Sequence, residues 1–299
     1  MVEDKVGIKD YLGIKINYSN ERLLDKFSLD TLKDRYLWEN ETHAQEAFAR
    51  ASVFGATYKG ETDFELAQRL YNYSSSRWFM FSTPILSNGG TTRGLPISCF
   101  LNYVPDSRRG LSDHYDENIW LASNGGGIGG YWGDIRSDGT STSHGSMSTG
   151  SIPFMRVVDS QMLAFNQGTT RRGSYACYMD VSHPEIEEFL FMRKSSGGDA
   201  NRKCLNLHHG INITDEFMNA VSKNIEWKLI DPHSKKVAKS INARELWRLI
   251  LETRHETGEP YLHFVDTSNR SLPETQKKLG LSIKPVSYTH LTLPTILLV

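Results

Sequence analysis

The stretch SYACYMDVSHPEIEEFL at residues 174–190 decides the fold class. Its first part, Ser174 to Val181, consists mainly of aromatic and other apolar residues and predicts a strand. In the second part, Ser182 and Glu185 have the spacing of a helix capping box, with a proline in the first turn. The helix that they open carries an apolar face of Ile186, Phe189 and Leu190. A strand followed directly by an amphipathic helix is typical of α/β proteins.

The same order of elements returns further along the chain. Cys204 to Ile213 alternates apolar and polar residues with a period of two, which predicts a second strand. Thr214 then begins another helix, and Asn242 with Glu245 caps one more. Strands that alternate with helices in this way predict an α/β architecture for this part of the chain.

The first part of the chain has a different texture. Residues 1–78 are polar and predict a mainly helical domain, in which Thr62 and Glu65 form a capping box. The helix expected after it presents one apolar face, made of Phe64, Ala67, Leu70, Tyr71 and Trp78. From STPILSNGG at 82–90 onwards, short apolar runs alternate with Gly, Pro, Asn and Thr. We therefore place a domain boundary near residue 79.

Composition excludes several classes of function. The 299 residues are 38% hydrophobic and 23% charged, as in ordinary globular proteins, and the net charge of −1 gives no basic surface for nucleic acid. The beginning of the sequence has no leader features, and no run of 18 apolar residues occurs, so we expect a cytoplasmic protein that does not contact membranes. Its three cysteines, an odd number, argue against a disulfide framework.

A glycine-rich motif, NGGGIGG at 124–130, is the first candidate for a ligand site. It contains the G-x-G-x-x-G pattern of dinucleotide-binding folds, but such a pattern follows a strand and opens a helix. Here the preceding residues 116–122 predict a helix, so that interpretation is weak. Two others remain open: a backbone that approaches a phosphate closely, and a tight turn.

Two polar loops and a histidine pair complete the local signals. Residues 136–150 and 166–173 read as loops, and Arg171 and Arg172 in the second suit either an anion or solvent. His208 and His209 lie next to each other on a predicted strand and point to opposite faces, so we expect structural histidines and no metal site. The residues by themselves therefore predict an α/β protein with a glycine-rich centre that can bind phosphate.

Several motifs together are much more specific than any one of them. They are STPILSNGG at 82–90, Arg93-Gly94, Ser98-Cys99-Phe100-Leu101, Asp106-Ser107, the glycines at 125–130, Ile135-Arg136-Ser137, Ser148-Thr149-Gly150, Arg171 and DTSNR at 266–270. In this order, over residues 15–284, the chain resembles the large subunit of ribonucleotide reductase, most closely class I. The resemblance implies a helical domain at 1–78 and, at 79–284, the first half of a ten-stranded α/β barrel.

The resemblance also implies an enzyme activity, the reduction of ribonucleoside diphosphates to deoxyribonucleotides by thiyl-radical chemistry for DNA synthesis. Cys99 matches one member of the redox dithiol that supplies the electrons. The residues that match the binding site for the substrate diphosphate are Thr83, Ser98, Gly126 and Gly127.

A second, allosteric site follows from the same resemblance. Asp106 matches the residue that binds the ribose of a deoxynucleotide or ATP effector, which carries Mg²⁺, and Arg136 with its loop matches the effector-phosphate loop. Gln167 and Arg171 match the loop that relays effector identity to the substrate. The helices at 113–123 and 153–165 match those that form a homodimer.

The implied partners are separate proteins. The radical comes from a small metal-containing subunit, and thioredoxin or glutaredoxin is the reductant, so we expect no cofactor or metal on this chain itself. We also expect no ATP cone before the helical domain. Cys177 and Cys204 match no functional position, and we expect them to pack in the core.

The chain departs from the family pattern after residue 284. There the family has a radical cysteine, an asparagine and a glutamate, whereas this sequence reads PVSYTH at 285–290. We interpret residues 285–299 as a non-native tail and expect the chain alone to be inactive. Two alternatives remain: a noncatalytic nucleotide-binding dimerisation module, and a fragment of an adenosylcobalamin-dependent reductase. The choice between diphosphate and triphosphate substrates also stays open.

Overall fold

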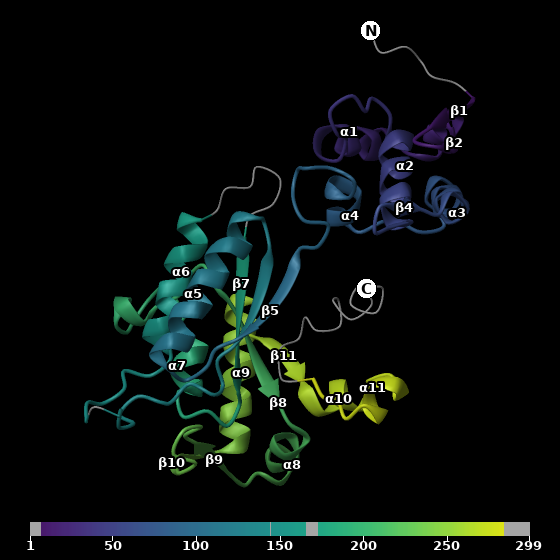
Figure 1. Cartoon of the computed structure of the whole chain (residues 1–299). Coiled ribbons are helices and arrows are strands. Elements are labelled where there is room, and N and C mark those ends of the chain that lie inside the picture. Colours follow the sequence, from purple (N-terminus) through teal and green to yellow (C-terminus); the bar gives the residue numbers. More distant parts are fainter. Residues whose placement is uncertain (1–6, 144, 166–172, 284–299) are drawn as a thin grey trace. The chain divides into compact units, whose positions relative to one another are not determined.

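The structure is a computed structural model that describes residues 7–143, 145–165 and 173–283 (Figure 1). The chain forms two compact units that divide between Ser98 and Cys99. The sequence placed a boundary near residue 79, which lies inside the first unit. The reason is helix α4 (Thr83–Asn88), which packs against α2 and contributes Leu86 to the core of the first unit.

The first unit is built around one buried helix. Helix α2 (Ala44–Gly55) packs against the other helices and a hairpin, and most of its first nine residues are fully buried. The elements around it are the hairpin β1 (Ile8–Tyr11) and β2 (Ile14–Asn17), η1 (Tyr18–Leu23), α1 (Lys26–Arg35), the hairpin β3 (Thr57–Tyr58) and β4 (Glu61–Thr62), α3 (Phe64–Ser75) and α4. The expected helical domain is present, with two short hairpins in addition.

The start and the end of helix α3 differ from the sequence prediction. Its N-cap is Asp63, whose side chain accepts a hydrogen bond from the backbone of Leu66, because Thr62 already belongs to strand β4. The helix ends at Ser75, so Trp78 lies beyond it and is 80% exposed. Ala67 and Tyr71 form the buried face as predicted.

The second unit is organised by a five-stranded parallel sheet in the order β11-β8-β7-β6-β5. Its strands are β5 (Cys99–Tyr103), β6 (Gly127–Tyr131), β7 (Ser174–Asp180), β8 (His208–Ile213) and β11 (Tyr261–Phe264). Sequence neighbours lie side by side, so each connection must cross over through helical structure. This arrangement confirms the α/β prediction, and it makes β5 and β11 the edge strands of the sheet.

Helices follow each strand of this sheet. They are α5 (Arg108–Ser123), α6 (Ile152–Ala164), α7 (Ile186–Phe191), η2 (Ala200–Arg202), α8 (Asp215–Lys223), α9 (Ala243–Thr257), α10 (Val265–Arg270) and α11 (Glu274–Lys278). An antiparallel hairpin, β9 (Glu226–Ile230) and β10 (Val237–Asn242), lies between α8 and α9. Figure 1 shows α5, α6 and α7 together along one side of the strands. Within the described part of the chain, no helix is both long and apolar enough to cross a membrane.

The predicted caps were right for two of these helices and wrong for a third. Thr214 and Asn242 accept hydrogen bonds from the first turns of α8 and α9, as expected. Ser182 does not cap α7, which begins only at Ile186 and has Glu185 at its N-cap. The carboxylate of Glu185 instead accepts hydrogen bonds from Ser151. Ser182 and Glu185 therefore do not form a capping box.

The two faces of the sheet carry different side chains. Tyr175, Cys177 and Met179 on β7 point into the main core beneath the helices, whereas Ala176 and Tyr178 point to the opposite face. Cys204 also lies in the main core, and burial raises the pKa of its thiol to about 12. Both cysteines therefore pack as small apolar residues, as predicted from the sequence.

The glycine-rich motif forms neither a dinucleotide-binding turn nor one tight turn. Gly125, with φ of +71°, makes the turn after α5, and Gly127 begins strand β6. A β-carbon on Gly130 would lie 1.6 Å from the hydroxyl of Tyr175. That hydroxyl is hydrogen-bonded at 3.0 Å to both Trp132 and His114. Because Gly130 has no side chain, the buried hydroxyl of Tyr175 can lie directly against the backbone of strand β6.

The histidine pair binds one carboxylate at the beginning of two strands. The Nδ1 atoms of His208 and His209 both contact Glu259, which precedes β11, and Arg193 is 3.2 Å from the same side chain. Burial alone would raise the pKa of Glu259, but hydrogen bonds from both histidines and the charge of Arg193 hold it well below its usual range. The carboxylate thus joins β8 to β11.

Replacing this carboxylate tests its contribution to the fold. We expect Glu259→Gln to lower the free energy of unfolding by about 3 kcal/mol at pH 7, because Arg193 loses a largely buried partner. A carboxylate with a depressed pKa stabilises the protein above its unfolded pKa, which is about 4.3, and this stabilisation is lost as the pH falls. Urea unfolding between pH 5 and pH 3 should therefore show a steeper loss for the unaltered chain than for the variant. Parallel pH profiles would contradict this assignment.

Candidate functional site

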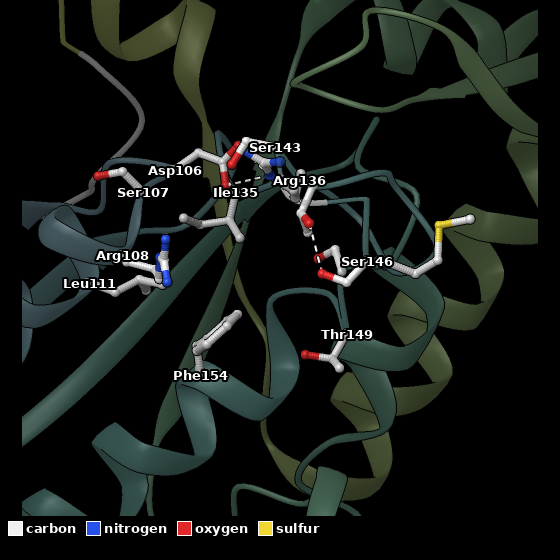
Figure 2. Close-up of a pocket in the computed structure, with 13 residues that line it drawn as sticks. Asp106, Ser107, Arg108, Leu111, Ile135, Arg136, Ser143, Ser146, Thr149 and Phe154 are labelled. Carbon is white, nitrogen blue, oxygen red and sulfur yellow. Dashed lines mark hydrogen bonds and ion pairs between the residues drawn. The ribbon is translucent and has the colours of Figure 1, made fainter.

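A pocket of about 550 Å³ lies in the second unit where helices α5 and α6 begin (Figure 2). Its lining consists of one acidic and two basic side chains, several hydroxyls and an apolar part. The residues are Asp106, Ser107, Arg108, Leu111, Ile135, Arg136, Thr142, Ser143, Ser146, Met147, Ser148, Thr149 and Phe154. The pocket therefore contains both residues that the sequence analysis associated with an effector.

The acidic and basic residues of the pocket are paired. The Nε atom of Arg136 lies 2.9 and 3.0 Å from the two carboxylate oxygens of Asp106, as the dashed lines in Figure 2 indicate. Both side chains are about one-fifth exposed, so water screens this pair only in part. Asp106 follows strand β5 and Arg136 follows β6, and their contact fixes two neighbouring strand ends at the pocket.

The charge distribution of the pocket suits a ligand with anionic and hydroxyl groups. Arg108 and Arg136 outnumber Asp106, and the first turn of α5 directs backbone N–H groups toward this end of the helix. Leu111, Ile135 and Phe154 add apolar surface to the lining. Such a combination of a few placed polar groups with an apolar wall is typical of small-molecule sites.

The loop from Ser137 to Ser151 forms one wall of the pocket and is held at both ends. At its beginning, the carboxylate of Asp231 accepts hydrogen bonds from the backbone and the hydroxyl of Ser137. At its end, Glu185 accepts hydrogen bonds of 2.9 Å from the backbone and the hydroxyl of Ser151. Burial raises the pKa of Glu185 to about 7, against the lowering effect of these hydrogen bonds.

Sequence reasoning did not find either of these anchors. Asp231 lies 94 positions from Ser137, and no local spacing points from one to the other. Glu185 was noted in the sequence, but as part of a capping box and not as a partner of this loop.

The second candidate site is the beginning of strand β5. Cys99 is paired with Gly127 in the parallel register of β5 and β6, and by alternation it shares a face with Leu101, opposite the helices. It is half-buried and is present as a thiol. Gly126 lies one residue before β6, and its N–H donates to the carbonyl of Leu121.

The other residues expected to bind substrate do not all lie in the same unit. Thr83 begins helix α4 in the first unit, where its hydroxyl is 3.2 Å from that of Tyr36. Ser98 is the last residue of the first unit, directly before Cys99. The two residues of the expected relay loop, Gln167 and Arg171, lie outside the described residues.

The helices expected at a dimer interface expose apolar side chains. Trp120 on α5 is 66% exposed, and Leu163 on α6 is 60% exposed. Other apolar side chains of α6, Val158 and Met162, are buried in the core. Among the described residues, no group of three or more histidines, cysteines or acidic residues is placed to hold a metal ion.

Comparisons with known proteins agree with this arrangement. Residues 22–94 match the model of the ribonucleotide reductase all-alpha domain, and residues 97–284 match that of the ribonucleotide reductase barrel domain. The ribonucleoside-diphosphate reductase large subunits of Invertebrate iridescent virus 6 and Invertebrate iridescent virus 3 are 44% and 41% identical over 91% and 94% of this chain.

The alignments cover only part of these proteins. The chain spans 28% and 52% of the lengths of the two viral relatives. In structure it is similar to the class Id ribonucleotide reductase alpha subunit of Actinobacillus ureae, with a TM-score of 0.69 and 28% identity over 87% of this chain and 44% of that one. Both family domains are present in order and the parallel sheet lies within the second, so the chain belongs to the family of ribonucleotide reductase large subunits.

Proposed function

We propose that this chain is part of the large subunit of a ribonucleoside-diphosphate reductase, which reduces ribonucleotides to deoxyribonucleotides for DNA synthesis in the cytoplasm. One observation carries the proposal: strand β5 begins at Cys99, beside Gly127, and leads at its other end to Asp106 in the pocket. A single strand thereby connects a thiol with a site suited to a nucleotide.

In the proposed reaction, Cys99 is one of two thiols that reduce the ribose. The two thiols become a disulfide and supply two electrons and two protons, while the 2′-hydroxyl leaves as water and hydrogen takes its place on the 2′-carbon. The second thiol and the thiyl radical belong to other parts of the subunit. Thioredoxin or glutaredoxin then restores the dithiol. The substrate diphosphate is held by the hydroxyls of Thr83 and Ser98 and at Gly126 and Gly127, where the absence of side chains lets it approach the backbone closely.

The pocket beside α5 is the proposed effector site. Asp106 would accept a hydrogen bond from the ribose of a deoxynucleotide or ATP, and Arg136 faces the phosphates, which carry Mg²⁺. The positive end of the α5 dipole favours the same anion. Gln167 and Arg171 are proposed to relay the identity of the effector to the substrate site.

Two protein partners complete the proposal. The exposed apolar residues of α5 and α6 support a homodimer through these helices, because unpartnered apolar side chains gain free energy when an interface covers them. The radical is supplied by a separate metal-containing small subunit. The likeness to an alpha subunit of class Id supports this source over adenosylcobalamin.

A noncatalytic nucleotide-binding dimerisation module is the second candidate. It is favoured by one observation: the effector pocket is lined by the described residues of the second unit alone, whereas the redox reaction needs a second thiol from elsewhere. Both candidates predict effector binding, and only the first predicts that Cys99 takes part in turnover.

Removing the carboxylate of Asp106 tests the effector site. We expect Asp106→Ala to weaken the binding of dTTP or dGTP by about tenfold or more, because the ribose loses a hydrogen bond to a charged group and Arg136 loses the contact that positions it. Isothermal titration calorimetry of the chain with Mg²⁺ and each nucleotide measures this. Glu252→Ala, at an exposed carboxylate on α9, is the matched control and should bind normally. Equal affinities for the unaltered chain and Asp106→Ala would refute the assignment.

Replacing the thiol of Cys99 separates the two candidate functions. In the complete reductase, Cys99→Ser should abolish thiol-dependent turnover, since a hydroxyl cannot form the disulfide, and should leave effector affinity unchanged. Cys204→Ala, at a buried core thiol, should retain turnover. Normal turnover of Cys99→Ser would remove this cysteine from the mechanism and favour the noncatalytic module.

A further inference from the structure

The turn of the β9–β10 hairpin, residues 231–234, reaches the effector pocket from a distant part of the sequence. One carboxylate oxygen of Asp231, Oδ2, accepts hydrogen bonds from the backbone N–H of Ser137 at 2.9 Å and from its hydroxyl at 2.7 Å. The same oxygen accepts a third, at 3.0 Å, from the hydroxyl of Thr140. Asp231 is 4% exposed, so these contacts are made away from water.

Only one of the two oxygens of this carboxylate is bound within the turn itself. The other oxygen, Oδ1, accepts a hydrogen bond of 2.7 Å from the backbone of Ser234, which is an ordinary turn contact. The three hydrogen bonds that Oδ2 accepts all come from the pocket loop. Burial would raise the pKa of Asp231, but the hydrogen bonds from Ser234 and Ser137 hold it well below its usual range. The group is therefore a fixed negative acceptor at neutral pH.

The same turn makes a second contact with the pocket. The Nδ1 atom of His233 lies 3.3 Å from Oδ2 of Asp106, the carboxylate that also binds Arg136. Asp106 is thus contacted by Arg136, which directly precedes the pocket loop, and by His233 of the hairpin. Since Ser137 directly follows Arg136, fixing the backbone of Ser137 also fixes the point from which the arginine side chain starts.

We propose that the β9–β10 turn is a positioning element of the nucleotide pocket, which acts through Asp231 on the pocket loop and through His233 on Asp106. The proposal rests on the proposed effector site and adds to it two residues that do not line the pocket. Without the turn, the beginning of the loop loses three hydrogen bonds and Asp106 loses its contact with His233. Nucleotide binding must then order these groups, and the cost of ordering lowers affinity.

The test for Asp231 combines hydrogen exchange with nucleotide binding on the full chain. Asp231→Asn retains an oxygen that can accept from Ser234 and places an amide group toward Ser137. We expect the amide of Ser137 to exchange about tenfold faster or more, and the affinity for dTTP with Mg²⁺ to fall about tenfold. Glu226→Gln, at an exposed carboxylate on the same hairpin, is the matched control and should change neither.

A double-mutant cycle distinguishes positioning from a general loss of stability. Ser137→Ala removes the hydroxyl that Asp231 binds, so the losses of dTTP affinity in Asp231→Asn and Ser137→Ala should not add in the double variant. Additive losses would mean that Asp231 does not act through the hydroxyl of Ser137, and an unchanged exchange rate of the Ser137 amide in Asp231→Asn would overturn the proposal for the loop. For His233, alanine should weaken dTTP binding severalfold, and glutamine, which keeps a donor, should restore part of it.

The outcomes separate this proposal from the one on which it rests. If the unaltered chain does not bind dTTP or dGTP, the effector site is wrong, and the exchange of Ser137 still decides whether Asp231 holds the loop. If the unaltered chain binds and Asp231→Asn shows unchanged exchange and unchanged affinity, the effector site stands and the positioning role is refuted.

Discussion

The second unit depends on a close contact between Tyr175 of β7 and Gly130 of β6. The tyrosine hydroxyl fits only because Gly130 has no side chain, and it is hydrogen-bonded to Trp132 and to His114 on α5. Two strands and the first helix of the unit are thereby fixed by one buried polar group, and burying such a group is favourable only when it is fully bonded. The position of α5 matters because its beginning forms part of the pocket.

The pocket shows how distant parts of a chain build one site. The turns after β5 and β6 provide Asp106 and Arg136, while the anchors of the loop come from Glu185 and from the β9–β10 turn. Loops are usually the most variable part of a fold, and this one is tied at each end by a buried carboxylate. The energy that holds the loop in place therefore comes from residues that do not line the pocket.

Much of the fold followed from local sequence patterns, and much of the site did not. Alternation predicted a strand over 204–213, of which His208–Ile213 forms β8. Side-chain oxygens at Thr214 and Asn242 predicted two helix starts. These signals depend on neighbouring residues only. Gly130 of β6 was harder to interpret, because the side chain that requires a glycine there, Tyr175, lies on another strand. Asp106 and Arg136 were found through the resemblance to a family, and no periodicity connects them. Asp231 was missed, because its partners are about 90 residues away.

Strand β5 is an edge of the described sheet, and it carries Cys99 on the face opposite the helices. The outer backbone groups of an edge strand can accept a further strand, and facing Cα atoms of paired strands lie about 4.5–5.5 Å apart. A disulfide requires nearly the same separation, about 4.4–6.8 Å. A cysteine on a strand added to this edge, opposite Cys99, would thus meet the geometry of a reversible cross-link without any movement of the main chain.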